Sequence, residues 1–239
     1  MKRLQGSRAL VTGGGRGIGR AIALALAAEG AEVALAARTT KELEATATAC
    51  REAGAAGTSV HAVDLTDGAA VDALAESLVS AGGVDVLVNN AGMGGQGDAL
   101  DGDPDVWTKV MALNVLAPLR LTRRLAPGMV ERERGTIINL GSVAAIEGMT
   151  NAGVYAASKH ALRGWSLSCY QKLRRSGIKV VLLNPAFVDT QMTEGIEGAK
   201  RDRMLSPEDI AEAAMLAIRT SPACCPEEIT LRLTKPPLS

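Results

Sequence analysis

The sequence predicts an α/β protein with a doubly wound parallel β-sheet, covered by helices on both faces. Short runs of Val, Leu, Ile and Ala, bounded by Gly, Asn or Asp, alternate along the chain with longer Ala-rich segments. The short runs are continuously apolar, which is typical of strands buried on both faces. Regular alternation of strands and helices favours a parallel sheet. No linker or repeat divides the chain, so residues 1–239 are expected to form one domain.

Seven strands are predicted in chain order, at residues 9–12, 32–36, 58–63, 84–88, 135–140, 179–183 and 228–232. Helices are expected between them, at residues 17–29, 40–53, 67–81, from about 104 through 114 and onward, 151–175 and from 206. Gly30, Gly54 and Gly82 follow the first three helices, where a glycine commonly ends a helix. The last helix begins with an N-cap, a proline and two acids in Ser206-Pro207-Glu208-Asp209. The polar segment 189–205, which contains Gly195 and Gly198, is expected to be a mobile break in the pattern.

The amino-acid composition excludes several classes of protein. Apolar residues make up 47% of the chain and charged residues 22%, with 26 basic against 26 acidic side chains. So apolar a chain is not expected to be disordered. A net charge of zero gives no general attraction to nucleic acid or to an anionic membrane. Aromatic residues are only 2%, which argues against a base-stacking platform and predicts an aliphatic core.

No segment resembles a targeting or membrane-spanning sequence. The longest clean apolar run, residues 21–28, is far shorter than the ~20 residues that a membrane helix needs. No apolar stretch follows the basic N-terminal residues. Cys50, Cys169, Cys224 and Cys225 have the spacing of neither a zinc site nor a disulfide framework. We therefore expect a cytoplasmic protein with reduced thiols and no bound metal.

A glycine-rich turn, Thr12-Gly13-Gly14-Gly15-Arg16-Gly17-Ile18-Gly19, joins the first predicted strand to the first predicted helix. Glycines at such a turn allow backbone N–H groups to approach a pyrophosphate at the helix N-terminus. The spacing G-x-x-x-G-x-G is neither the G-x-G-x-x-G fingerprint nor a P-loop. The order of strand, turn and helix nevertheless favours a dinucleotide-binding turn over one without a ligand.

The end of the second predicted strand indicates which dinucleotide is bound. Sites for NAD usually place Asp or Glu here, to bond the ribose hydroxyls. This chain has Ala37 and Arg38 instead. An arginine can hold the 2′-phosphate of NADP through charge-assisted hydrogen bonds, so the sequence predicts a preference for NADP(H).

Tyr155 and Lys159 lie four residues apart in the long predicted helix, which places them on one helical face. A lysine ammonium beside a phenol favours the phenolate and lowers the phenol pKa from ~10. A tyrosine with such a pKa can exchange a proton with a substrate oxygen near neutral pH. Ser142 follows the fifth predicted strand and is placed to hydrogen-bond the same oxygen.

Five motifs together resemble the short-chain dehydrogenase/reductase family. They are Thr12–Gly19, Asn89-Asn90-Ala91-Gly92, Asn114, Ser142 and Tyr155-x-x-x-Lys159, in the order and approximate spacing of the family. The resemblance covers nearly the whole chain and implies a seven-stranded Rossmann-type sheet. It also implies an enzyme that transfers a hydride between NADP(H) and a ketone or secondary alcohol, such as a carbonyl reductase. Family members usually form dimers or tetramers, which implies a homodimer or homotetramer.

The resemblance assigns roles to individual residues. Tyr155 would be the proton donor or acceptor, Lys159 would lower its pKa, Ser142 would orient the carbonyl, and Asn114 would hold a water that links Lys159 to solvent. Asn184-Pro185-Ala186-Phe187-Val188-Asp189-Thr190 resembles the segment that closes over the nicotinamide, although the family usually has Gly at the position of Ala186. The expected cofactor contacts are then Gly13, Gly15, Arg16, Gly17, Ile18, Gly19, Arg38, Asp64, Leu65, Asn90, Ala91, Gly92, Tyr155, Lys159, Pro185, Val188 and Thr190.

Two other functions remain open from the sequence. A 3-oxoacyl-[acyl-carrier-protein] reductase would dock an acidic carrier protein, and basic residues are available at Arg120, Arg123, Arg124, Lys172, Arg174 and Arg175. Solvated helix faces are the preferred interpretation of these residues. A non-catalytic dinucleotide sensor would need the glycine turn but not the four expected catalytic residues. His61 and His160 are expected to be structural or surface residues. The substrate is expected to be selected by residues 94–103, 143–151 and 189–205.

Overall fold

The parallel sheet that the sequence predicts is present. The computed structural model describes residues 2–95, 97, 100–194, 196 and 198–238. Within these residues the strands are β1 (Arg8–Thr12), β2 (Glu32–Ala37), β3 (Gly57–Ala62), β4 (Val86–Asn89), β5 (Gly135–Leu140), β6 (Ile178–Pro185) and β7 (Glu228–Leu231). Their order across the sheet is β3-β2-β1-β4-β5-β6-β7, and every neighbouring pair is parallel. The predicted Rossmann-type fold class is confirmed.

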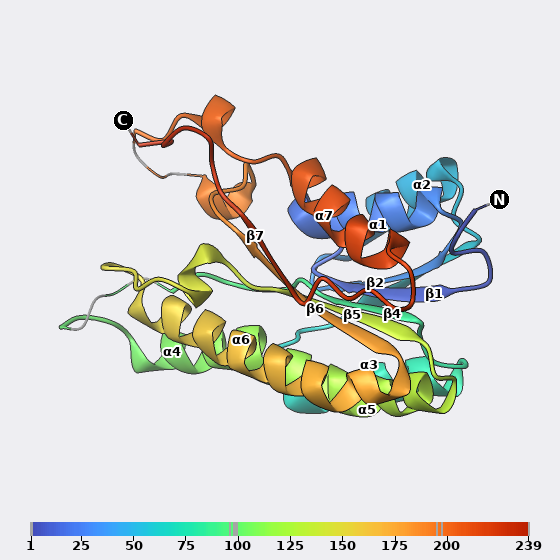
Figure 1. Ribbon diagram of the computed structural model, residues 1–239. Helices are drawn as coiled ribbons and strands as arrows, with labels where there is room; N and C mark the ends of the chain where they lie inside the picture. The colour runs from blue at the N-terminus through green and yellow to red at the C-terminus, as the bar shows by residue number, and fades with distance from the viewer. Residues whose placement is uncertain (1, 96, 98–99, 195, 197, 239) are drawn as a thin grey trace.

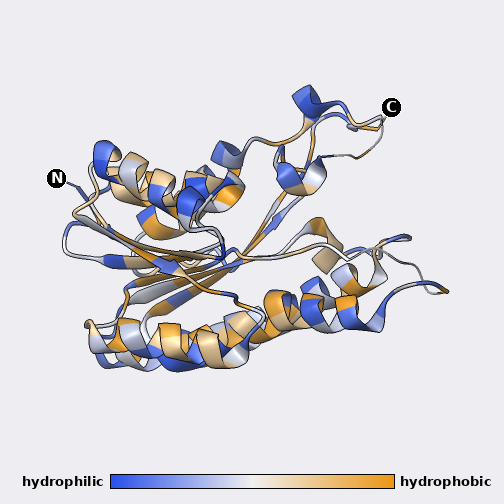
Figure 2. Ribbon diagram, turned by 180° about the vertical axis from the view of Figure 1, so that it is seen from behind, coloured by the Kyte–Doolittle hydropathy of each residue, from blue (hydrophilic) through white to orange (hydrophobic). Residues whose placement is uncertain are grey.

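Helices cover both faces of this sheet, as Figure 1 shows. One face carries α1 (Gly17–Ala28), α2 (Thr40–Ala53) and α7 (Pro207–Arg219), and the other carries α3 (Gly68–Ser80), α4 (Pro104–Met111), α5 (Ala117–Glu131) and α6 (Gly153–Leu173). A layer of buried apolar side chains fills each interface. The hydropathy colouring of Figure 2 shows the apolar strands between these layers. Among the described residues, the largest fully buried side chains are all Leu, Ile or Met, so the aliphatic core is confirmed.

The strand order reverses between β1 and β4. Val11 of β1 pairs with Leu35 of β2 on one side and with Val88 of β4 on the other. The chain then leaves β1 for α1 on one face and leaves β4 for α4 on the opposite face. Such a reversal opens a crevice at the carboxyl ends of the strands, where ligands bind in doubly wound sheets.

The largest departure from the predicted elements lies in the helix expected to run from Pro104 through Asn114. A π-helical turn, η1 (Ala112–Leu116), separates α4 from α5. π-turns inside helices are frequent at functional sites. The pattern of apolar and polar residues along the chain does not distinguish such a turn from a continuous helix. Strand β6 is also longer than predicted and extends to Pro185, because Asn184 and Pro185 still pair with β7.

Helix ends are confirmed where cap chemistry marks them. At the start of α7, Asp209 N–H donates to Ser206 Oγ at 3.1 Å, and Ser206 N–H donates to Asp209 Oδ2 at 2.7 Å. Gly54 ends α2 with a φ of 103°. None of the described helices is both long and apolar enough to span a membrane.

The segment 189–205 contains two short 3₁₀ turns, η4 (Gln191–Thr193) and η5 (Arg201–Arg203). A β-bridge between Val188 and Leu205 closes the segment at its base. Of its two glycines, Gly198 has a φ of 74°, and Gly195 lies outside the described residues. The expected mobility of this segment stays a prediction.

Candidate active site

The turn between β1 and α1 requires glycine for steric reasons. Gly13 and Gly17 have φ of +64° and +51°, in the left-handed region that side chains disfavour. A Cβ built on Gly19 would lie 2.2 Å from the Gly13 carbonyl oxygen. The N-cap residue of α1 is Arg16, and its side chain, which has no acceptor, makes no capping hydrogen bond with the first N–H groups of the helix. The turn therefore presents uncapped backbone donors at the crevice, the arrangement that binds phosphate.

Thr12 fastens this turn to the end of β4. Its buried Oγ1 accepts hydrogen bonds from Asn90 N–H at 2.9 Å and Ala91 N–H at 3.0 Å. Asn90 Nδ2 donates in return to the Thr12 carbonyl oxygen at 2.8 Å. A Cβ on Gly13 would meet Asn90 Nδ2 at 2.7 Å. The structure thus brings the predicted Gly13, Asn90 and Ala91 together at the strand-order reversal.

The residues expected around an adenosine lie at the ends of β2 and β3. Arg38 is exposed. Hydrogen bonds from Thr66 hold the pKa of Asp64 below its usual value, and the charge of Arg38 adds to this effect. Asp64 Oδ1 accepts from Thr66 N–H at 2.9 Å and from Thr66 Oγ1 at 2.8 Å. Leu65 is buried in the core, with only 4% of its surface exposed. Its side chain also lines a cavity of about 220 Å³ beside α3, η1 and α5.

Arg16 is paired with an acid that the sequence analysis did not single out. Its Nη1 lies 3.2 Å from Glu42 Oε1 of α2. A Cβ on Gly15 would lie 2.9 Å from Glu42 Cβ, and Thr46 Oγ1 of the same helix donates to the Gly15 carbonyl oxygen at 3.0 Å. Helix α2 therefore supports the glycine turn from outside.

Tyr155 and Lys159 lie one turn apart on α6 and face the carboxyl end of β5. Lys159 is 5% exposed, and its Nζ donates to the Leu140 carbonyl oxygen at 2.7 Å. The same Nζ lies 5.6 Å from the centre of the Tyr155 ring. A Cβ on Gly92 would lie 3.6 Å from Lys159 Nζ and 3.3 Å from Asn114 Oδ1. The chain after β4 thus meets the proposed catalytic face of α6.

The expected lowering of the Tyr155 pKa is wrong for the protein without ligand. Burial raises the pKa of the Tyr155 phenol, and a hydrogen bond with Ser142 offsets only part of that increase. Burial also lowers the pKa of Lys159 to about 8. The attraction between ammonium and phenolate, on which the expectation rested, is opposed by the desolvation of both groups, which disfavours both charged forms.

Asn114 occupies the π-turn and is 1% exposed. Its Oδ1 accepts from Met93 N–H at 2.9 Å, and its Nδ2 donates to the Met93 carbonyl oxygen at 2.9 Å. Nδ2 also donates to Ser158 Oγ at 3.0 Å, and Ser158 Oγ donates to the Tyr155 carbonyl oxygen at 2.7 Å. Asn114 therefore ties the segment after β4 to α6. Its expected binding of a water stays a prediction.

Ser142 follows β5 and caps the short turn η2 (Val143–Ala145), where its Oγ accepts from Ala144 N–H at 3.1 Å. It is 9% exposed and hydrogen-bonds Tyr155 through its side chain. Its own N–H donates to Asn184 Oδ1 at 3.3 Å. The structure therefore brings all four expected catalytic residues into one connected cluster.

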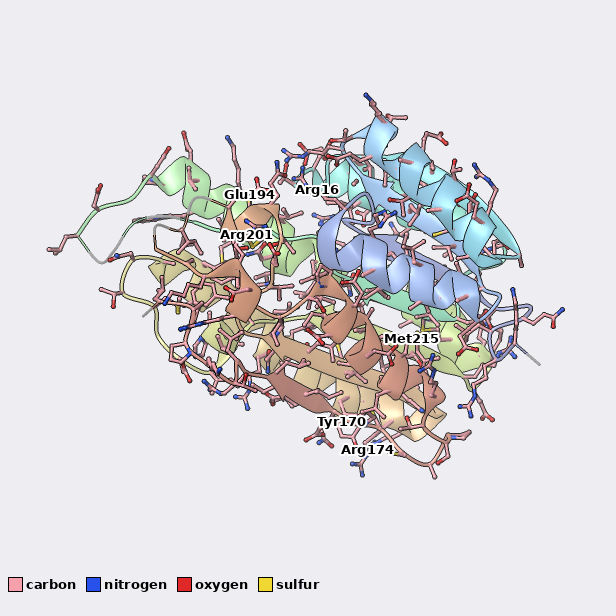
Figure 3. The ribbon with its side chains drawn as sticks, turned by 90° about the horizontal axis from the view of Figure 1, so that it is seen from above. Arg16, Tyr170, Arg174, Glu194, Arg201 and Met215 are labelled. Carbon is pink, nitrogen blue, oxygen red and sulfur yellow. The ribbon has the colours of Figure 1, made fainter. Side chains whose placement is uncertain are left out.

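The segment after β6 borders the glycine turn, as the resemblance implies. A Cβ on Gly17 would lie 3.2 Å from Thr190 Cγ2, and in Figure 3 the segment with Glu194 and Arg201 lies beside the Arg16 end of α1. Val188 is buried, and its carbonyl oxygen accepts from Thr193 Oγ1 at 2.7 Å. Ala186 has no positive φ, so the backbone accepts it in place of the usual glycine.

The remaining candidate groups make local contacts. His61 hydrogen-bonds Ser59 at 3.1 Å and His160 Nδ1 lies 3.0 Å from the Ala156 carbonyl oxygen. Among the described residues, no group of three or more His, Cys, Asp or Glu is placed to hold a metal ion, and all four cysteines are free. Arg120 pairs with Asp72 at 2.7 Å, and Arg174 stacks 5.4 Å from the Tyr170 ring (Figure 3). These contacts favour solvated helix faces.

Several residues that support the site were missed. Ser158 stands between Tyr155 and Lys159 and joins α6 to Asn114. Asn184 was named only as the first residue of the segment expected to close over the nicotinamide, and its acceptance of a hydrogen bond from Ser142 N–H was not predicted. Arg163 and Glu228 connect to Asn184 from α6 and β7. Nothing in the sequence pairs Asn184 with Ser142, or Arg163 with Glu228.

Comparison with known proteins establishes the class. The profile of the family described as short chain dehydrogenase matches residues 7–201. The chain therefore belongs to the short-chain dehydrogenase/reductase family, and it is an oxidoreductase of that class.

Individual relatives agree with this class. A protein provisionally named as a ketoacyl reductase of the monensin polyketide synthase in Streptomyces virginiae is 38% identical over 211 residues, which cover 87% of this chain and 79% of the relative. An uncharacterized oxidoreductase of Staphylococcus aureus strain MW2 is 32% identical over 94% of this chain and 96% of its own. A metagenomic short-chain oxidoreductase solved in complex with NADP is 35% identical with a TM-score of 0.85, over 98% of this chain and 99% of that one. An alcohol dehydrogenase from the archaeon Thermococcus sibiricus, complexed with 5-hydroxy-NADP, is 26% identical with a TM-score of 0.87, over 95% of this chain and 97% of its own.

Proposed function

We propose that this protein is an NADP(H)-dependent oxidoreductase that interconverts ketones and secondary alcohols, with Tyr155 as the proton donor or acceptor. The observation that carries the proposal is the connected cluster of Asn114, Ser142, Tyr155 and Lys159 beside the glycine turn. A non-catalytic dinucleotide sensor would need the turn alone.

The residues at the crevice fit NADP(H). The turn offers uncapped N–H groups for the pyrophosphate, and Gly13, Gly17 and Gly19 leave room where a Cβ would clash or strain the backbone. Arg38 is exposed at the end of β2, where an acid would favour NAD. Two relatives of known structure are complexes with NADP or an NADP derivative. The proposed contacts are those predicted from the sequence.

In the proposed reaction NADPH supplies the hydride, and the protein supplies orientation and a proton. Ser142 Oγ holds the substrate carbonyl oxygen, and the Tyr155 hydroxyl gives that oxygen its proton. Lys159, protonated below its pKa of about 8, places a positive charge beside the phenol and stabilises the phenolate that forms. Asn114 and Ser158 hold α6 against the segment after β4, which fixes the position of Tyr155.

The finer substrate class has two candidates. Free ketones are the first, and a 3-oxoacyl group on a carrier or a polyketide is the second, favoured by the similarity to the ketoacyl reductase of S. virginiae. NADPH oxidation measured with a panel of free ketones and with an acetoacetyl carrier thioester distinguishes them by kcat/KM.

We also propose a homodimer or homotetramer in the cytoplasm. The support is the family resemblance together with exposed apolar residues in η1 and α5, namely Leu116 at 50% and Val130 at 36% exposed. Light scattering coupled to size exclusion measures the mass of the assembly, and a monomer would contradict this part.

The test of the proposed mechanism is Tyr155→Phe. General acid catalysis contributes ~10²–10⁴-fold, so kcat should fall by at least about a hundredfold while NADPH still binds. Tyr170→Phe is the matched control, because Tyr170 lies on the same helix and contacts Arg174 instead of Ser142. Retention of more than about a tenth of wild-type kcat by Tyr155→Phe would contradict the role. NADPH binding without turnover of any substrate in the wild type would favour the sensor.

A further inference from the structure

A line of hydrogen bonds runs from the outside of α6 to the backbone of Ser142. Arg163 Nε donates to Glu228 Oε1 at 2.9 Å, and Arg163 Nη2 donates to Glu228 Oε2 at 3.1 Å. Asn184 Nδ2 donates to the same Glu228 Oε1 at 2.8 Å. Asn184 Oδ1 then accepts from Ser142 N–H at 3.3 Å. Four elements of structure are joined in this way: α6, β7, β6 and the chain that follows β5.

This line closes a ring with the proposed catalytic residues. Arg163 and Tyr155 belong to the same helix, two turns or about 12 Å apart along its axis. Tyr155 hydrogen-bonds Ser142 at the other end of the line. The separation of Ser142 from Tyr155 is therefore set by two routes, one through their direct contact and one through Glu228 and Asn184.

The side chain of Asn184 is buried, and its hydrogen bonds fix its position. Its side chain is fully buried, between apolar residues of β6 such as Leu183. A buried amide costs stability unless its donors and acceptor are used. A Cβ on Gly141 would lie 2.1 Å from Asn184 Oδ1, so the absence of a side chain at Gly141 is what lets the amide reach the Ser142 N–H.

We propose that Asn184 and Glu228 are positioning residues for the reaction, and that they act by fixing Ser142 at its distance from Tyr155. Arg163 orients Glu228 through a two-pronged ion pair, and Glu228 orients the amide of Asn184. The inference rests on the proposed function, because it assigns a task to residues that support the same site.

The variants separate positioning from simple anchoring of the edge strand β7. Asn184→Asp would bring two carboxylates to hydrogen-bond distance and break the line. The double variant Asn184→Asp with Glu228→Gln exchanges amide and carboxylate, so that Gln Nε2 donates to the new Asp and Gln Oε1 still accepts from Arg163. Glu29→Ala is the matched control, because Glu29 pairs with Arg219 at 3.1 Å, and its side chain is 22% exposed against 20% for Glu228.

The measurements are kcat and KM for a ketone, the NADPH dissociation constant by fluorescence, and the melting temperature. An ångström of misplacement can cost about 10² in rate, so we expect Asn184→Asp to lower kcat by about tenfold or more. The NADPH dissociation constant should change less than twofold. The double variant should recover kcat to within about threefold of wild type, and Glu29→Ala should lower the melting temperature without lowering kcat.

Two results overturn the inference alone: a wild-type kcat in Asn184→Asp, or a double variant that folds and binds NADPH but stays as slow as the single variant. A loss of NADPH binding in step with kcat also overturns it, because the residues would then serve the fold in general. If the wild type itself turns over no carbonyl substrate, the proposed function fails and the inference fails with it.

Discussion

Lys159→Met should change how the stability of this protein depends on pH. Lys159 is 5% exposed, and its Nζ donates a hydrogen bond to the Leu140 carbonyl oxygen at 2.7 Å. Burial of the side chain lowers the pKa of Lys159. The folded protein therefore binds the proton of Lys159 more weakly than the unfolded chain does.

The size of the effect follows from the two pKa values. Burial lowers the pKa of Lys159 from 10.5 to about 8 in the folded protein. Between these values the unfolded chain binds a proton that the folded protein does not, so the free energy of unfolding rises with pH. Each pH unit is worth about 1.4 kcal/mol. At pH 9.5 the wild type should therefore have gained roughly 2 kcal/mol over its stability at pH 7, relative to a variant without this group.

The assay is urea unfolding of the wild type and Lys159→Met at pH 7, 8, 9 and 9.5. The difference between their free energies of unfolding should grow by roughly 2 kcal/mol over this range, in favour of the wild type. Lys172→Met, at an exposed position of the same helix, should keep the pH profile of the wild type. Parallel profiles for the wild type and Lys159→Met, or a difference that shrinks as pH rises, would refute the reasoning.

Three further predictions follow from the cofactor side of the crevice. Arg38→Ala should lower the kcat/KM ratio of NADPH to NADH by about tenfold or more, since a hydrogen bond to a charged group contributes about 1.5–3 kcal/mol; an unchanged ratio, or a wild type that prefers NADH, would refute the predicted preference. Thr12→Val should lower the free energy of unfolding by about 1–3 kcal/mol in urea, because it leaves the Ala91 N–H without the Thr12 Oγ1 acceptor, whereas Thr12→Ser should restore most of it. Gly19→Ala should abolish NADPH binding in a fluorescence titration, because its Cβ would lie 2.2 Å from the Gly13 carbonyl oxygen; binding within twofold of wild type would show that the turn relaxes freely.

The sequence predicts the fold well because its signals are local and repeated. Continuous apolar runs mark β1 and β4–β6, and the cap chemistry at Ser206 and the glycine at Gly54 mark helix ends that the structure confirms. The π-turn at Asn114 was not predictable, since it arises from contacts with Met93 and Ser158 that lie 21 and 44 residues away in the chain. The periodicity of apolar residues reports on contacts within one helix or strand. This turn depends on contacts with the segment after β4 and with α6.

Some residues of the site could be predicted from the sequence, and others could not. Motif spacing was enough to place Gly13, Asn90 and the face shared by Tyr155 and Lys159. It was not enough for Arg163 and Glu228, which are 65 residues apart and become neighbours only because β7 pairs with β6 beside α6. Charged residues are common on helices, so no local pattern distinguishes Arg163 from a solvated arginine.

The Tyr155 pKa shows where a motif argument needs burial as well as charge. In the protein without ligand, desolvation raises the pKa of the phenol and lowers that of Lys159. Both shifts disfavour the charged form of the group, and an opposite charge that approaches either group would favour its charged form again. Lys159 is still mostly protonated at pH 7, one unit below its pKa of about 8. For ketone reduction a raised phenol pKa is no handicap, because Tyr155 then holds the proton that it must give. In the opposite direction the phenol must first lose that proton, so the same burial should shift alcohol oxidation toward alkaline pH.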